Sequence, residues 1–175
     1  MDEGMKTARA RNHRLWAWAA VGLWVALIFC FSSDAFAAHE TSAFLLPLLK
    51  RCFPELDAAR LATLHYALRK SAHVGEYAVL ALLSRSALHQ GNPSPPLRAV
   101  CLSLALVFAV ALLDESRQSV SAVRTGSARD VALDVFGGTL MLAFAAAVRH
   151  WWECPRRCRR GKRSGATCRA PASEP

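Results

Sequence analysis

Charged side chains are scarce in the middle of this chain of 175 residues. Only 20% of the residues are charged and 53% are hydrophobic, yet the net charge is +9. Residues 15–148 hold ten basic and nine acidic side chains, so almost all of the positive charge lies in residues 1–14 and 149–175. A nucleic-acid-binding domain would need its basic residues on a folded face. The separation of the charge from the apolar body therefore excludes nucleic acid as the expected partner.

Cysteine patterns typical of zinc sites or disulfide scaffolds are also missing. Of the six cysteines, Cys30 and Cys101 lie inside apolar runs, and only Cys52 falls in an expected outer loop. The three cysteines of the tail lack the Cys-x2-Cys spacing of zinc ligands. We therefore expect neither a secreted disulfide scaffold nor a zinc module, and no cofactor is predicted.

What the chain does have is a series of long apolar runs. Each is close to the length that crosses about 30 Å of hydrocarbon as a helix. The fold class predicted is all-α, a polytopic membrane protein with four transmembrane helices. The four expected spans are Leu15–Phe31, Ala72–Leu88, Leu97–Leu113 and Val131–Val148.

The basic residues at the two ends predict the orientation of this membrane domain, residues 15–148. Segments rich in lysine and arginine stay in the cytoplasm, and four spans return the chain to its starting side. We thus expect a multi-pass protein of the bacterial cytoplasmic (inner) membrane, with residues 1–14 and a disordered basic tail, 149–175, both cytoplasmic. Ala35-Phe36-Ala37 after the first apolar run also resembles a signal-peptide cleavage box, an alternative that would remove the first span.

A short amphipathic helix is predicted in the outer segment before the second span. Pro54 and the acids that follow it are typical of a helix start. Leu61, Leu64 and Leu68 then form one apolar stripe opposite Arg60, His65 and Arg69. This pattern predicts a surface helix over residues 55–70 that runs into the second span, either covering the bundle or sensing lipid.

The most informative residues are polar ones where hydrocarbon is expected. An ionisable group that faces lipid at membrane depth costs at least about 2.5–3.5 kcal/mol, so such groups should face each other or a wet cavity. The second span starts outside, the third ends outside and the fourth starts outside, so their polar residues should meet at the outer leaflet. Gly137 and Gly138, near the acids of the fourth span, predict a face for close helix packing. The converging residues are Lys70, His73, Glu76, Tyr77, Asp114, Glu115, Gln118, Arg124, Asp130 and Asp134.

These residues also carry a family resemblance. The series from Lys70-x-x-His73-x-x-Glu76-Tyr77 through Asp114-Glu115-x-x-Gln118 to Asp134 and Gly138 is similar to the VanZ-like family of small bacterial membrane proteins. Phe31-Ser32-Ser33 matches a serine pair of that family, whereas Val120, Ala122 and Val123 depart from its loop pattern. The resemblance implies a role in low-level glycopeptide (teicoplanin-type) antibiotic resistance or in cell-envelope maintenance, and it implies no particular reaction.

Three hypotheses for this cluster follow. In the first, a membrane-embedded enzyme modifies a lipid, a lipid-linked cell-wall intermediate or a glycopeptide. The candidate catalytic residues, which would transfer protons as general acids or bases, are His73, Glu76, Asp114, Glu115, Asp130 and Asp134. Substrate would be held by Lys70, Tyr77, Gln118 and Arg124.

In the second hypothesis the cluster binds a ligand or only fixes the helices, with Lys70–Glu76 or Arg124–Asp130 as buried ion pairs. In the third, the protein is a proton-coupled transporter that dimerises. The pattern leaves open whether the protein is an enzyme. A metal site is not predicted, because one histidine without a thiolate is a poor zinc ligand set. The expected partners are membrane lipids and a lipid-linked precursor or glycopeptide, with a homodimer as an alternative.

Overall fold

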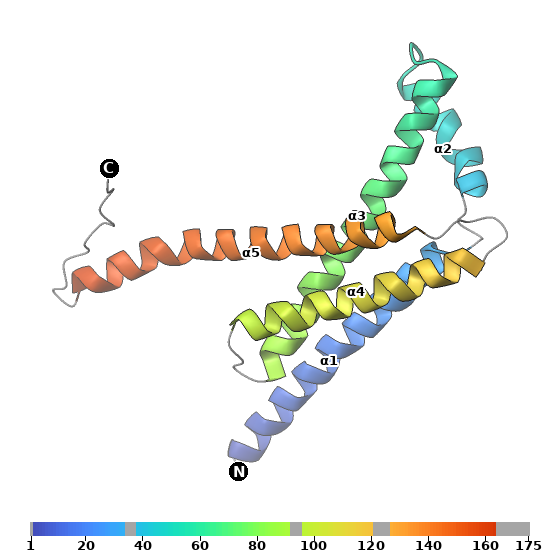
Figure 1. The fold of residues 1–175 in the computed structure, drawn as a ribbon. Helices are drawn as coiled ribbons and strands as arrows, with labels where there is room; N and C mark the ends of the chain where they lie inside the picture. The colour runs from blue at the N-terminus through green and yellow to red at the C-terminus, as the bar shows by residue number, and fades with distance from the viewer. Residues whose placement is uncertain (1, 34–37, 92–95, 121–126, 164–175) are drawn as a thin grey trace. The chain divides into compact units, whose positions relative to one another are not determined.

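The computed structural model is all-helical in its described part. It describes the backbone of residues 2–33, 38–91, 96–120 and 127–163, and the side chains of residues 9, 11–33, 41–89, 97–120 and 127–152. Along the chain, five helices follow one another (Figure 1). They are α1 (Asp2–Phe31), α2 (Ala38–Cys52), α3 (Ala58–Gly91), α4 (Pro96–Val120) and α5 (Ala128–Arg163).

Three of these helices are long and apolar enough to cross a membrane. The segments are Arg11–Phe31 of α1, Leu97–Val120 of α4 and Ala128–Trp152 of α5. They coincide with three of the four expected spans and extend each of them. The expected second span lies inside α3 but is not among these candidate spans, because it carries too many polar residues.

Helix α3 occupies the centre of residues 1–142, which form one of two compact units. It packs along α1, α4 and α2. The core around it includes Val21, Ile28, Leu80 and Val107, each at most 4% exposed. A helix covered by three others contacts little lipid, which explains how α3 carries polar residues that a lipid-facing helix would not tolerate.

The segment of residues 55–70 continues into the expected second span, as predicted, but its apolar stripe does not match the prediction. Residues 58–70 are the first turns of the continuous helix α3, and Asp57 caps its start by accepting a hydrogen bond from the Arg60 amide at 2.8 Å. His65, expected on the polar side, is buried at 7% exposure, whereas Leu68 of the apolar stripe is 43% exposed.

An additional helix packs against this part of α3. Helix α2 was not predicted from the sequence; it contains Pro47, although proline disfavours helix interiors. The Arg69 guanidinium donates a hydrogen bond to the Thr41 hydroxyl at 2.7 Å, which ties α2 to α3.

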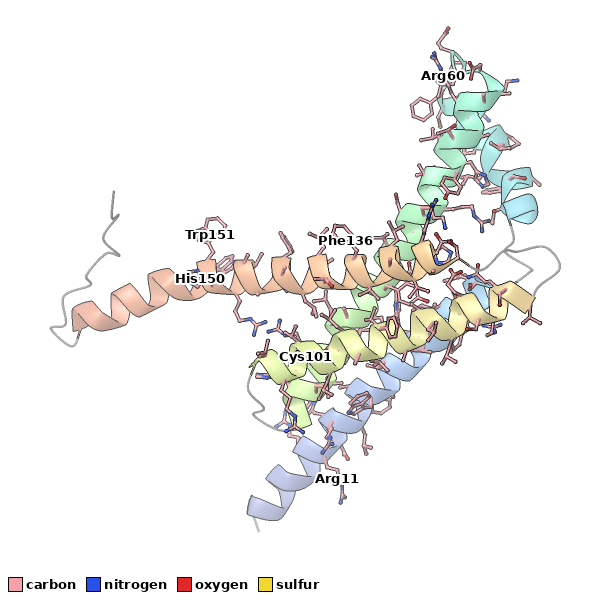
Figure 2. The ribbon with its side chains drawn as sticks, viewed as in Figure 1. Arg11, Arg60, Cys101, Phe136, His150 and Trp151 are labelled. Atoms are coloured by element: carbon pink, nitrogen blue, oxygen red, sulfur yellow. The ribbon has the colours of Figure 1, made fainter. Side chains whose placement is uncertain are left out.

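The second compact unit, residues 143–175, contains the last part of α5. Residues 149–163 continue α5 as a helix, where the sequence predicted the start of a disordered tail. Trp151 and Trp152 are exposed, as interfacial tryptophans would be; Trp151 is labelled in Figure 2. The possible cleavage box at residues 35–37 lies outside the described residues.

Candidate functional site

The end of α1 and the last turns of α4 are joined by a buried hydrogen-bond network. The Ser32 hydroxyl donates to Asp114 Oδ2 at 2.7 Å. The Gln118 amide donates to Ser32 Oγ at 2.7 Å and to Asp114 Oδ2 at 3.0 Å. All three side chains are buried, with Asp114 only 1% exposed. We call Ser32, Asp114 and Gln118 the buried triad.

Arg117 lies beside the buried triad and contacts Asp114 and Phe29. Arg117 Nη1 lies 3.9 Å from Asp114 Oδ1 and donates a hydrogen bond to the Phe29 carbonyl at 3.5 Å. Its guanidinium also sits 5.0 Å from the centre of the Phe29 ring, a favourable cation–π arrangement. The final turn of α1 is therefore held against α4 by polar contacts.

Glu115, the neighbour of Asp114 in the sequence, contacts the start of a different helix, α5. Its Oε2 accepts a hydrogen bond from the Ser127 amide at 2.7 Å, immediately before α5 begins. Ser127 in turn caps α5, because its carbonyl accepts from the Asp130 amide and its hydroxyl from the Arg129 amide. A carboxylate of α4 thus fixes where α5 starts.

Helix α5 is also tied to α3, by an ion pair and by close packing. Lys70 pairs with Asp130, and each side chain is 25% exposed. A Cβ placed on Gly137 would lie 2.7 Å from a methyl group of Val74 and 2.8 Å from its carbonyl oxygen, so only glycine fits there. At Gly138 the nearest atom, a Val107 methyl, would be 3.3 Å away. The predicted close-packing face is confirmed.

The ion pairing differs from one of the two predicted pairs, Lys70–Glu76. Lys70 pairs with Asp130 of α5 and not with Glu76 of its own helix. Glu76 pairs instead with His73, at 3.6 Å. Lys70 also lies 5.6 Å from the centre of the Tyr66 ring. The other predicted pair, Arg124–Asp130, cannot be examined because Arg124 lies outside the described residues.

Tyr77 lies at the centre of these groups. It is 0% exposed, so it is not an interfacial anchor. Its phenol is within electrostatic range of Asp114, Asp134, Glu76 and Glu115. Among the described residues, the Tyr77 hydroxyl has no hydrogen-bond partner, nor have Glu76 Oε2 and Asp114 Oδ1, and all three atoms are buried.

The remaining acid joins the same assembly. Asp134 is 3% exposed and lies within electrostatic range of Glu115, Asp130, Asp114 and Lys70. Nine of the ten predicted residues thus belong to one connected assembly, to which Ser32 must be added. We call this assembly the polar cluster: Ser32, Lys70, His73, Glu76, Tyr77, Asp114, Glu115, Gln118, Asp130 and Asp134. Polar side-chain atoms gather near the start of α5 in Figure 2.

Several contacting residues were not predicted. Ser32 was noted as part of a serine pair but given no role; its signal is a hydroxyl directly after an apolar run. Trp24 donates its indole N–H to the Glu76 carbonyl at 2.8 Å, which pins α1 to α3 beside the cluster. Among the described residues, no group of three or more His, Cys, Asp or Glu side chains could hold a metal ion.

A groove opens beside the cluster, between α4 and the first turns of α5. Its volume is about 650 Å³. Glu115 belongs both to the cluster and to the groove wall. The lining residues are Phe108, Leu112, Glu115, Ser116, Ser119, Ser127, Ala128, Val131, Ala132 and Val135.

Comparison with known proteins agrees with this architecture. Neither the curated proteins nor the solved structures contain a significant match to the chain. The profile of the VanZ/LLP1 family matches residues 17–149, a range that includes every member of the polar cluster and both glycines of α5. The chain therefore belongs to the VanZ/LLP1 family.

Proposed function

We propose that the polar cluster binds the polar end of an amphiphile at the outer leaflet of the bacterial inner membrane. The amphiphile would be a lipid, a lipid-linked cell-wall intermediate or a glycopeptide of the teicoplanin type. Support for this comes from the family membership and from the position of the cluster at the ends of apolar helices. It would place the protein in envelope maintenance or antibiotic resistance.

One observation carries the proposal. Three buried polar atoms lack a hydrogen-bond partner among the described residues: Tyr77 OH, Glu76 Oε2 and Asp114 Oδ1. The two carboxylate oxygens lie in ion pairs, with His73 and with Arg117, so the Tyr77 hydroxyl is the group that a ligand would satisfy. Leaving a buried polar group unsatisfied costs about 1–3 kcal/mol. A group kept at that expense, in the same cluster as the groove-lining Glu115, is suited to receive a ligand that satisfies it.

The proposed sidedness requires α3 to cross the membrane as the fourth span. Both termini then lie in the cytoplasm, and the loops after α1 and α4 lie outside. An alkaline phosphatase fusion in the α4–α5 loop should be active, and the same fusion between α3 and α4 inactive. The reverse pattern, or activity of both fusions, would place the cluster on another side or overturn the span count.

The cluster also contains the groups needed for chemistry on such a ligand. His73 and Glu76 form an acid–base pair at 3.6 Å, and Asp114, Glu115, Asp130 and Asp134 supply further carboxylates. In this catalytic form of the proposal, Lys70 and Gln118 hold the substrate while a carboxylate or His73 moves a proton.

Substitution of Tyr77 by phenylalanine tests the binding proposal directly. Tyr77→Phe removes a hydroxyl without a described partner, so thermal stability should stay the same or rise. Loss of one hydrogen bond to the ligand should weaken its retention by about tenfold, equivalent to about 1.4 kcal/mol. The measurements are lipid that co-purifies with the full-length protein, by mass spectrometry, and teicoplanin susceptibility of cells that express it.

Tyr66→Phe is the matched control. Its phenol is 63% exposed and lies outside the cluster, so both readouts should match the unchanged protein. If Tyr77→Phe retained the same lipid and the same susceptibility, the cluster would not be a ligand site.

A second function, a purely structural cluster, is favoured by the buried triad and the Lys70–Asp130 pair, because both join different helices. In that case melting temperature and phenotype would fall together in every variant of the cluster. A proton-coupled transporter would instead lose its activity when the membrane potential or the pH gradient is collapsed.

A further inference from the structure

The groove lies between α4 and the first turns of α5, next to the hydrogen bond from the Ser127 amide to Glu115. In the described part of the chain, the helix pairs that pack extensively are α1–α3, α3–α4 and α2–α3. Helix α5 is held by Glu115 at its start and by α3 on its glycine face. The α4 side of α5 is therefore left open over its first two turns.

The lining of the groove changes in polarity along its length. Its outer end carries the hydroxyls of Ser116, Ser119 and Ser127 and the Glu115 carboxylate. Its inner end is apolar on both walls. Phe108 and Leu112, which are 51% and 48% exposed, form the α4 wall, opposite Val131, Ala132 and Val135 of α5. This gradient matches a molecule with a polar head and an apolar tail.

The length of the groove distinguishes a lipid tail from a partner helix. From Phe108 to Ser119 an α-helix rises by about 16 Å, at 1.5 Å per residue. This is about half of the 30 Å hydrocarbon thickness, so the groove covers a single leaflet. A transmembrane helix of a second copy would continue through both leaflets and is about 10 Å wide, whereas one acyl chain fits the length of the groove.

The charge at the polar end indicates the kind of headgroup. The cluster contains five carboxylates: Glu76, Asp114, Glu115, Asp130 and Asp134. Asp130 pairs with Lys70, Asp114 lies 3.9 Å from Arg117 and Glu76 lies 3.6 Å from His73. Glu115, which lines the groove, accepts a hydrogen bond from the Ser127 amide. The Glu115 carboxylate at the end of the groove favours an ammonium group. The Ser127 hydroxyl, which accepts a hydrogen bond from the Arg129 amide, can donate to an adjacent phosphate, whereas Ser116 and Ser119 already donate to carbonyls of α4.

We infer that the α4–α5 groove holds one acyl chain of a phosphatidylethanolamine-type phospholipid, with its ammonium group directed at Glu115 and the polar cluster. The inference rests on the proposed function and names its ligand class. Glu115 forms the link, because it lines the groove and also belongs to the cluster.

Photo-crosslinking tests this inference with the full-length protein in nanodiscs. The probe is phosphatidylethanolamine with a diazirine in the middle of one acyl chain, and labelled peptides are mapped by mass spectrometry. Labelling should concentrate on Phe108–Leu112 and Val131–Val135. Unlabelled phosphatidylethanolamine should compete about tenfold better than phosphatidylglycerol, a preference of about 1.4 kcal/mol. Glu115→Gln should remove that preference.

Two tryptophan substitutions form a matched pair. Ala132→Trp fills the groove and should lower the labelling of the groove by about tenfold. Ala109 is exposed but lies outside the lining, so Ala109→Trp should change the labelling by less than about twofold. Equal labelling of all exposed α4 and α5 positions, or no effect of Ala132→Trp, would overturn the groove assignment. Equal competition by phosphatidylglycerol would overturn the headgroup assignment.

The outcomes separate this inference from the broader proposal. Loss of ligand in Tyr77→Phe without groove-specific labelling would leave the cluster as a ligand site and reject the groove. Groove labelling that Ala132→Trp blocks, combined with no effect of Tyr77→Phe, would support the groove and reject the cluster as its headgroup site.

Discussion

Asp114 and Glu115 are adjacent in the sequence, yet they face regions of opposite character. Asp114 turns to α1, where the buried triad joins two helices through short hydrogen bonds. Glu115 turns to α5, where it caps the helix start and lines an open groove. The comparison teaches that one polar cluster has a closed side that holds helices together and an open side that remains available. Substitutions should therefore affect stability on one side and ligand retention on the other.

The largest effect on stability is expected from a substitution on the closed side of the cluster. Asp114→Ala removes the acceptor shared by Ser32 and Gln118 and leaves both buried groups short of a partner. We expect the free energy of unfolding to fall by about 3 kcal/mol, as is typical when a partner in a buried charged network is removed. Thermal melting of the purified protein in detergent, followed by circular dichroism, measures this loss.

Glu115→Ala provides the contrast on the open side. Its loss removes one cap interaction, worth about 1 kcal/mol, so its effect on melting should be clearly the smaller of the two. Equal destabilisation by the two alanine variants would show that the cluster has no closed and open sides.

A smaller effect should follow from separating α5 from α3. Gly137→Ala forces a methyl group against Val74, and overpacking of this kind costs about 1–3 kcal/mol. Because the groove lies beside α5, the same change should alter its crosslinking pattern. Gly75→Ala is the control: its Cβ would meet nothing within 4 Å, and replacing a helical glycine should stabilise by about 0.5–1 kcal/mol. A neutral Gly137→Ala would show that this contact is not tight.

The smallest effect concerns the N-terminal part of α3, where His65 lies outside the polar cluster. Burial, with Arg69 nearby, lowers the pKa of His65 below its usual value. The unfolded chain therefore binds a proton more readily than the folded one. Stability should fall as the pH decreases through about 6.5, the usual histidine pKa, and level off below the lowered pKa. His65→Gln should flatten this part of the melting-temperature profile; an unchanged profile would exclude His65 as its source.

Sequence patterns predicted the membrane class, three of the apolar spans and most of the polar cluster. These predictions succeeded because ionisable residues in apolar helices are costly when they face lipid, so they lie toward one another. Partner choice was less predictable: Lys70 was paired with Glu76 on its own helix, whereas α5 brings Asp130 to it. Only the packing of α5 against α3 through Gly137 determines that contact.

The sequence patterns predicted the structure least well in residues 38–70. Helix α2, which contains Pro47, was not predicted. The helix of residues 55–70 was predicted to run into the second span, as α3 does, but the faces of this helix were assigned wrongly. His65 is buried there even though periodicity placed it on the polar side, next to a helix that had not been predicted. Such contacts depend on a partner helix far along the chain, which periodicity within one segment cannot reveal.

The central position of α3 has a consequence for biogenesis. In the four-span topology, the polar residues His73, Glu76 and Arg85 make α3 a poor substrate for insertion on its own, since a charged residue opposes insertion by about 2.5–3.5 kcal/mol at the middle of a span and by less toward its ends. Its covering helices are α1, made before it, and α4, made after it. We expect α3 to remain at the insertion machinery until α4 emerges, so that the two enter the bilayer as a hairpin.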